Sequence, residues 1–153
     1  MEKAKTIKVL NTLIEINNCR IEAYETASRV SVEHDLKTLF ENLVQTSHKC
    51  TMELESEIVK LSGKPKEGIS VIGKFFRIWM DIKVGLAGKI RKNILNSCEY
   101  GENLIIETYK IVLENDSEYL TLNQVRLIQA QLALIKADYK KVKSKSNAFE
   151  VIA

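Results

Sequence analysis

Four long stretches of this chain contain no proline and almost no glycine, and this feature limits the possible fold more than any other. The single proline is Pro65, and all six glycines lie between positions 63 and 101. Proline and glycine interrupt helices, so the segments on either side of this region can form long, continuous ones. Apolar residues recur there every three or four positions, which is the period of a helix with one buried face. The sequence therefore predicts an all-α fold.

The apolar period predicts the individual helices and the limits of the domain. Four long helices are expected over residues 6–30, 31–61, 89–115 and 121–143. Ser31 is the expected N-cap of the second helix, and Thr121 is expected to open the last. Residues 71–86 are apolar around most of a helical circumference, so they are expected to form a short helix across the bundle, with Phe75, Trp79 and Ile82 packed against it. We expect one domain, residues 1–145, and a flexible C-terminal tail, residues 146–153.

The lengths of the connections predict the topology. The links between the first two long helices and between the last two are short, which makes each pair an antiparallel hairpin. About 27 residues separate the second long helix from the third, and a 16-residue helix within them would cover roughly 24 Å. Such a connection can return to the far end of the bundle. The sequence therefore predicts a ferritin-like four-helix bundle with a short crossover helix between the second and third long helices, ahead of an up-down-up-down bundle.

Several runs of sequence resemble a known family. They are LNTLIEINN and EAYETA in the first helix, the GKP break, FFRIWMDIK in the crossover and ILNSCEYGE in the third long helix. Together they resemble a bacterial ferritin-like four-helix-bundle family catalogued as a domain of unknown function. The resemblance extends to about Tyr139. It implies the fold and brings no activity, cofactor or site residue with it.

A row of polar residues falls on or beside the apolar stripes of the four long helices. These residues are Asn17, Cys50, Glu102 and Gln131. With the first and last helices rising and the middle two descending, each lies about 11 to 13 residues from the lower end of its helix, within the uncertainty of the helix ends. They are expected to share one layer of the core, with Arg20 and Ser47 one turn higher. A buried carboxylate is costly unless it is paired, so Arg20 is the expected partner of Glu102.

This buried polar layer has two interpretations, which the sequence leaves open. The first is a structural network that fixes the register of the helices. The second is a degenerate metal or small-ligand site, with Glu102, Glu57 and Glu99 as candidate anionic ligands and Asn17 as a neutral one. A di-iron bundle needs Glu-x-x-His pairs from two of its helices. His48 is expected to face solvent, and the last helix contains neither Glu nor His, so the second interpretation is the weaker one.

Composition and charge narrow the possible functions. The formal net charge is +3, and the lysines near the C-terminus, from Lys136 to Lys145, fit a solvated helix end, so no nucleic acid is expected as a partner. The charged N-terminus and the three widely spaced cysteines favour a cytoplasmic protein with free thiols and no membrane contact. Cys50 is expected to be a small core residue, and no catalytic residue is predicted. We expect an uncharacterised, non-enzymatic protein without a cofactor, acting through binding or assembly and able to self-associate. The alternative is a metal-binding ferritin-like protein that holds a divalent ion.

Overall fold

The computed structural model describes residues 2–68 and 91–152, and all regular structure within these ranges is helical. The elements are α1 (Lys3–Val30), α2 (His34–Lys60), α4 (Arg91–Asn115), the short 3-10 helix η1 (Ser117–Tyr119) and α5 (Leu122–Ile152). The prediction of an all-α bundle with four long helices is confirmed for the described part of the chain. The predicted crossover helix over residues 71–86, with Phe75, Trp79 and Ile82, lies outside the described residues.

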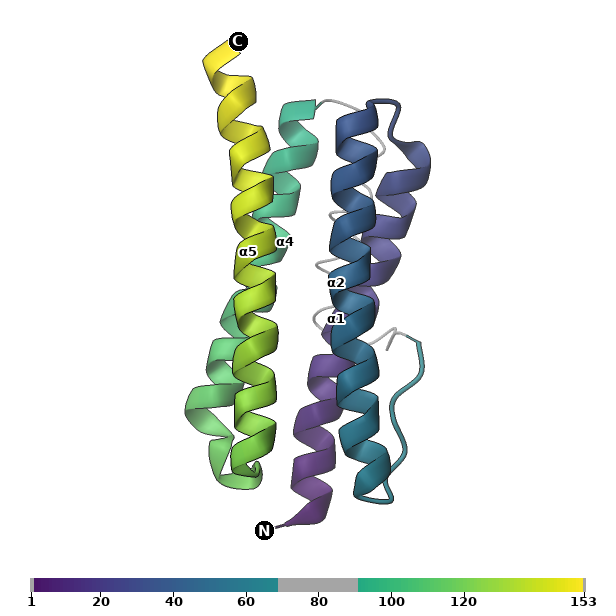
Figure 1. Cartoon of the computed structure of the whole chain (residues 1–153), viewed down its shortest axis with the longest axis vertical. Coiled ribbons are helices and arrows are strands. Elements are labelled where there is room, and N and C mark those ends of the chain that lie inside the picture. Colours follow the sequence, from purple (N-terminus) through teal and green to yellow (C-terminus); the bar gives the residue numbers. More distant parts are fainter. Residues whose placement is uncertain (1, 69–90, 153) are drawn as a thin grey trace.

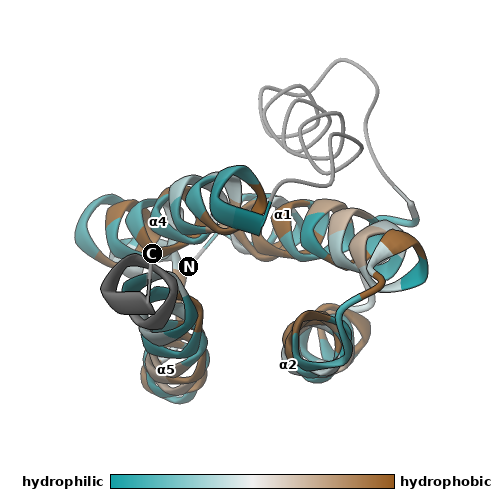
Figure 2. Ribbon diagram, turned by 90° about the horizontal axis from the view of Figure 1, so that it is seen from above, coloured by the Kyte–Doolittle hydropathy of each residue, from teal (hydrophilic) through white to brown (hydrophobic). Residues whose placement is uncertain are grey.

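The four long helices form a bundle of two hairpins. α1 packs along α2 and α4 packs along α5, and the view from above places α1 beside α4 and α2 beside α5 (Figure 2). α1 and α5 run in one direction while α2 and α4 run in the other (Figure 1). The Arg91 guanidinium at the start of α4 accordingly lies 2.8 Å from a carboxylate oxygen of Asp35 at the start of α2. The connection between α2 and α4 therefore starts at one end of the bundle and finishes at the other.

The C-terminus of α2 explains the break in the sequence after Leu61. The Gly63 N–H donates to the Ile58 carbonyl, the Ser62 N–H donates to the Val59 carbonyl, and Ser62 has a φ of 58°. These features define a Schellman motif in which serine, where glycine is usual, takes the left-handed position. At Gly63, a Cβ atom would lie 2.6 Å from the terminal methyl carbon of Ile7, so that side chain would have to move to make room for a larger residue.

The connection begins its return along α1. Asn11 donates to the Lys64 carbonyl over 3.3 Å and accepts from the Lys66 N–H over 2.7 Å, and Asn18 donates to the Gly68 carbonyl over 2.9 Å. Asn11 and Asn18 lie two turns apart on one face of α1, so residues 64–68 follow this face toward the other end of the bundle.

The predicted cap of α2 is wrong. Ser31 caps the preceding helix, because its hydroxyl donates to the Ala27 carbonyl at the end of α1. The N-cap of α2 is Glu33, which makes no side-chain capping bond. Ser31 lies in the short link between the two helices, and a serine hydroxyl can cap either the end of one helix or the start of the next. The sequence pattern therefore does not decide which helix Ser31 caps.

The start of α5 follows the prediction, whereas its end does not. Thr121 and Gln124 form a reciprocal capping box, in which the Gln124 N–H donates to the Thr121 hydroxyl and the Thr121 N–H to the Gln124 side chain, over 3.1 and 3.0 Å. The helix then continues to Ile152, through most of the residues predicted to form a flexible tail. Ser146 is buried, and the sequence contains no proline or glycine after position 101 that could stop the helix.

We predict that Thr121→Ala lowers the free energy of unfolding by about 1 kcal/mol, because it removes one half of the capping box and leaves a backbone N–H without its acceptor. Denaturant titration followed by circular dichroism measures this loss. Thr46→Ala is the matched control, since the Thr46 hydroxyl donates to the Asn42 carbonyl within α2 and caps nothing. Equal losses in the two variants would contradict the capping role.

The apolar core is divided into two clusters along the axis of the bundle. One cluster joins residues 19–27 of α1 to residues 36–44 of α2, with Ile94, Leu95, Cys98 and Val142. The other joins residues 9–16 of α1 to Leu54 and Ile58 of α2 and to the later part of α4 and the early part of α5. Buried polar side chains, including Asn17, Arg20, Ser47 and Glu102, occupy the level between them. The core is therefore apolar toward both ends and polar in the middle.

Candidate functional site

The predicted polar residues are all buried, but they belong to two groups of contacts. Asn17, Arg20, Cys50, Glu102 and Gln131 are each 0% exposed. Arg20 and Glu102 belong to an upper group, which we call the arginine cluster and which comprises Arg20, Tyr24, Ser47, Glu102 and Asp138. Asn17 and Gln131 belong to a lower group, which we call the amide network and which comprises Asn17, Glu53, Tyr109 and Gln131. Each group takes side chains from all four long helices.

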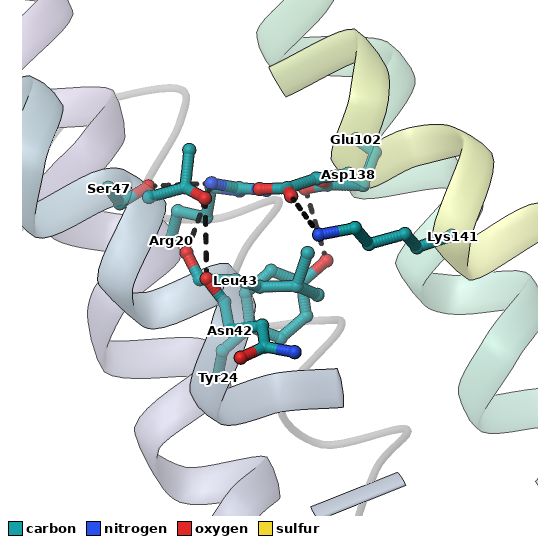
Figure 3. A network of polar contacts seen from close by, with 9 residues as sticks. Arg20, Tyr24, Asn42, Leu43, Ser47, Glu102, Asp138 and Lys141 are labelled. Carbon is teal, nitrogen blue, oxygen red and sulfur yellow. Dashed lines mark hydrogen bonds and ion pairs between the residues drawn. The ribbon is translucent and has the colours of Figure 1, made fainter. Parts of the chain in front are cut away.

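All five N–H groups of the Arg20 guanidinium donate hydrogen bonds, four to side chains of the arginine cluster and one to the Leu43 carbonyl (Figure 3). Nε and Nη2 donate to the two oxygens of Glu102 over 2.8 and 2.5 Å, which makes the pair bidentate. Nη2 also donates to Asp138 over 3.1 Å. Nη1 donates to the Ser47 hydroxyl over 2.9 Å and to the Leu43 carbonyl over 3.2 Å. Because arginine has five donors and no acceptor, its hydrogen-bonding capacity is fully met without water.

Two further contacts fix the carboxylates around Arg20. The Tyr24 hydroxyl donates to Glu102 over 3.2 Å, and the Tyr24 ring lies 5.6 Å from the guanidinium carbon of Arg20. The Lys141 ammonium lies 3.8 Å from the second oxygen of Asp138, at the edge of the bundle. Two cations therefore face two carboxylates, so the formal charges of these four side chains cancel.

The electrostatics of the cluster favour the charged form of Arg20. Burial lowers the pKa of its guanidinium, but the charge and hydrogen bonds of Glu102 raise that pKa by more, and the net shift is upward. Burial also raises the pKa of the Tyr24 hydroxyl well above its ordinary value. Tyr24 is therefore a neutral donor and Arg20 a permanent cation over the whole physiological pH range.

The amide network lies about one turn lower and is neutral at its centre. Asn17 donates over 2.9 Å to the hydroxyl of Tyr109, which itself donates to the side-chain carbonyl of Gln131 over 2.8 Å. The Gln131 amide then donates to the Cys50 carbonyl over 3.2 Å and to Glu53 over 3.1 Å. The Oδ1 atom of Asn17 is buried and has no hydrogen-bond partner among the described residues, so this network is less completely satisfied than the arginine cluster.

Cys50 contributes its backbone to the amide network, and its thiol is held in the neutral form. Burial raises the pKa of the Cys50 thiol to about 11. Because the thiolate is the reactive form of cysteine, this setting disfavours nucleophilic chemistry at neutral pH. All three cysteines, Cys19, Cys50 and Cys98, are buried and free.

The structure does not bring the candidate metal ligands together. Glu102 is bound by Arg20, and the half-buried Glu57 pairs with Lys60 over 2.9 Å on the surface of α2. Glu99 is also half-buried. Within residues 2–68 and 91–152, no group of three or more His, Cys, Asp or Glu side chains is placed to hold a metal ion. His48 is exposed beside Glu25, as the helical period predicts.

Four members of the two groups were not predicted as polar site residues. Tyr24 and Tyr109 fall on the apolar stripes of α1 and α4, and their rings lie in the core, but their hydroxyls also bind members of the two polar groups. Asp138 falls three residues after Ile135 and four before Val142, so the helical period itself places it on the buried stripe of α5. Glu53 lies three residues after Cys50 on α2. The sequence contains no comparable signal that this side chain takes part in the buried network.

The two groups can organise the bundle, but they leave little reactive chemistry available. Each donor of Arg20 has an acceptor, both oxygens of Glu102 accept hydrogen bonds, and the phenols and thiols are neutral. A nucleophile or a general base needs a group that can reach a substrate and change its protonation near neutral pH. The described side chains of the arginine cluster are buried and bind one another, so they do not meet the first of these conditions.

None of the helices that the structure describes is long and apolar enough to cross a bilayer.

Comparisons with known proteins give the family but no activity. No curated protein matches the chain, and no solved structure matches it. Residues 5–115 match a family described as a domain of unknown function, DUF2383. This match covers more than half of the 153 residues, so the chain belongs to the DUF2383 family.

Proposed function

We propose that this protein is a ferritin-like helical bundle that acts non-enzymatically, through binding or self-association at its surface. The observation that carries the proposal is the saturated guanidinium of Arg20 at the centre of the core. Its five donors are accepted by Glu102, Asp138, Ser47 and the Leu43 carbonyl. Because the polar groups at the centre of the core use their hydrogen bonds on one another, they support a structural role. We therefore place the binding activity of the protein at its surface.

The ferritin-like description is supported by the directions of the helices. α1 and α5 run opposite to α2 and α4, and the one long connection lies between α2 and α4 (Figure 1). A single long crossover is the feature that distinguishes ferritin-like bundles from up-down-up-down bundles with short loops. The three buried free thiols are compatible with the reducing cytoplasm, which is where we place the protein.

The alternative, a metal-binding bundle, is less well supported by the same geometry. Di-iron bundles gather carboxylates and histidines from four helices around a pair of cations. Here Glu102 and Asp138 point into the core from α4 and α5, but the guanidinium of Arg20 already supplies the cation between them. A metal ion would have to displace a buried arginine that is held by five hydrogen bonds.

We predict that the protein carries no stoichiometric metal and does not accelerate the oxidation of ferrous iron above the rate in buffer. Elemental analysis of protein purified without chelators or affinity metals measures the first quantity, and the absorbance of ferric products after aerobic addition of iron measures the second. Stoichiometric metal, or saturable oxidation that Glu102→Ala abolishes, would overturn the proposal in favour of the metal-binding alternative. Sedimentation at several protein concentrations tests self-association in the same sample.

A further inference from the structure

Arg20 fills a space whose walls come largely from the other three helices. The acceptors around its guanidinium are Glu102 on α4, Asp138 on α5, and Ser47 and the Leu43 carbonyl on α2. We propose that these groups form a preformed binding site for a guanidinium cation, which Arg20 occupies in the native chain as a tethered ligand. This inference rests on the proposed role of Arg20 as the cation of the core.

Three of the four acceptor groups, all but the Ser47 hydroxyl, are also held in place without Arg20. The Leu43 carbonyl belongs to the backbone of α2, and Ser47 lies one turn further along the same helix. The Tyr24 hydroxyl donates to Glu102 over 3.2 Å, and Lys141 lies 3.8 Å from Asp138. Removing the end of the Arg20 side chain would therefore leave an anionic, buried space with its hydrogen-bond acceptors still oriented inward.

The arrangement of the acceptors favours a guanidinium ion over a metal ion. Each acceptor lies 2.5–3.2 Å from a guanidinium nitrogen. Each nitrogen is itself bonded to the central carbon, so the acceptors lie roughly 4 Å from that carbon. Oxygen ligands of Ca²⁺ or Mg²⁺ lie only about 2.0–2.6 Å from the ion. The oxygens would have to move inward on all three helices before they could coordinate a metal.

The variant Arg20→Ala tests the site, because it removes two methylene groups and the guanidinium and keeps Cβ. N-ethylguanidinium contains the missing atoms. We expect it to raise the thermal midpoint of Arg20→Ala in a saturable manner, by roughly 5–10 °C at 100 times its Kd, and to give no saturable rise with the native protein, whose site is filled. If Arg20→Ala is unfolded alone, the expected result is the return of its helical circular dichroism signal on adding the ligand.

Three controls separate this site from general effects of the salt. Ethylammonium carries the same charge without the planar set of donors, and it should give less than a tenth of the affinity of N-ethylguanidinium. Arg126→Ala removes an exposed arginine from α5 and should respond like the native protein. Adding Glu102→Gln to Arg20→Ala removes the anionic half of the bidentate pair and should weaken the binding of N-ethylguanidinium at least tenfold.

Two results would overturn the inference. The first is an Arg20→Ala protein that shows neither a saturable rise in its midpoint nor recovered helicity with N-ethylguanidinium. The second is stronger stabilisation of this variant by Mn²⁺ than by N-ethylguanidinium, which would mean that the oxygens close around a metal ion. Both results concern the variant, whereas the proposed function is tested by the metal content of the native protein, so the two can fail separately.

Discussion

Replacing Arg20 with methionine is expected to lower the free energy of unfolding by roughly 3–5 kcal/mol. Methionine is unbranched and fills much of the volume of arginine, but it is shorter and leaves the buried carboxylate of Glu102 without its cation. The carboxylate is 0% exposed, so water cannot replace the lost partner unless the core opens. Breaking a buried ion pair in this way is more harmful than removing both members, because one charge stays behind without compensation. Denaturant titration at neutral pH measures the effect.

The double variant Arg20→Met with Glu102→Leu isolates the interaction itself. It removes both charges and keeps an apolar side chain at each position, while Asp138 retains Lys141 at a distance of 3.8 Å. We expect the loss of unfolding free energy in the double variant to be smaller than the sum of the losses in the two single variants, by at least about 1 kcal/mol. This difference lies within the coupling of about 0.5–3 kcal/mol found for residues in contact. Additive losses would mean that the two residues do not interact.

Arg126→Met is the matched control for the loss of an arginine. Arg126 is exposed on α5, and substitutions at such positions usually change stability by less than about 0.5 kcal/mol. A loss at Arg126 equal to that at Arg20 would show that the change in net charge, and not the buried pair, determines the stability of the bundle.

The sequence predicted the polar centre because polar residues on an apolar helical stripe are visible without a structure. It placed Asn17 and Glu102 in one layer, whereas the structure assigns them to different groups. The reason is the direction of side chains, which tilt toward the N-terminus of their own helix. α1 and α4 run in opposite directions, so their side chains tilt in opposite senses, and Arg20 is the residue whose side chain reaches Glu102, over 2.8 Å. Counting residues from helix ends locates the backbone only.

The missed members of the centre show a second limit of the sequence. Tyrosine carries an apolar ring and a polar hydroxyl, so Tyr24 and Tyr109 fit an apolar stripe and a hydrogen-bond network equally well. Only their neighbours in space decide which role the hydroxyl takes. Asp138 was predictable, since both flanking turns of α5 bury Ile135 and Val142 on the same side. Its partner Lys141 was not, because a lysine next to a solvated helix end has many possible positions.

The buried thiols and phenols predict that the bundle unfolds in alkali. Burial raises the pKa of Cys50 to about 11 and that of Cys19 to about 12, and it raises the pKa of Cys98 as well. It also raises the pKa of Tyr24 and Tyr109 well above their ordinary value of 10.0. In each case the folded state holds its proton more tightly than the unfolded state does. The stability that these groups contribute is therefore fully present below about pH 9 and is lost as the pH rises toward the folded values.

The expected loss is large, because several groups act over the same range of pH. Each group that is protonated when folded and ionised when unfolded removes up to about 1.4 kcal/mol per pH unit, so three thiols together give roughly 4 kcal/mol per unit near pH 10. A domain with a total stability of about 5–15 kcal/mol should then unfold between roughly pH 10 and 12 without denaturant.

Denaturant titrations at pH 7, 9 and 10 measure the slope of the unfolding free energy against pH. Replacing Cys19, Cys50 and Cys98 together with alanine should lower stability at pH 7 but flatten this slope between pH 9 and 10, whereas Tyr100→Phe, at a position that is 62% exposed, should leave it unchanged. An unaltered slope in the triple variant would show that ionisation of surface groups, and not of the buried thiols, drives the unfolding.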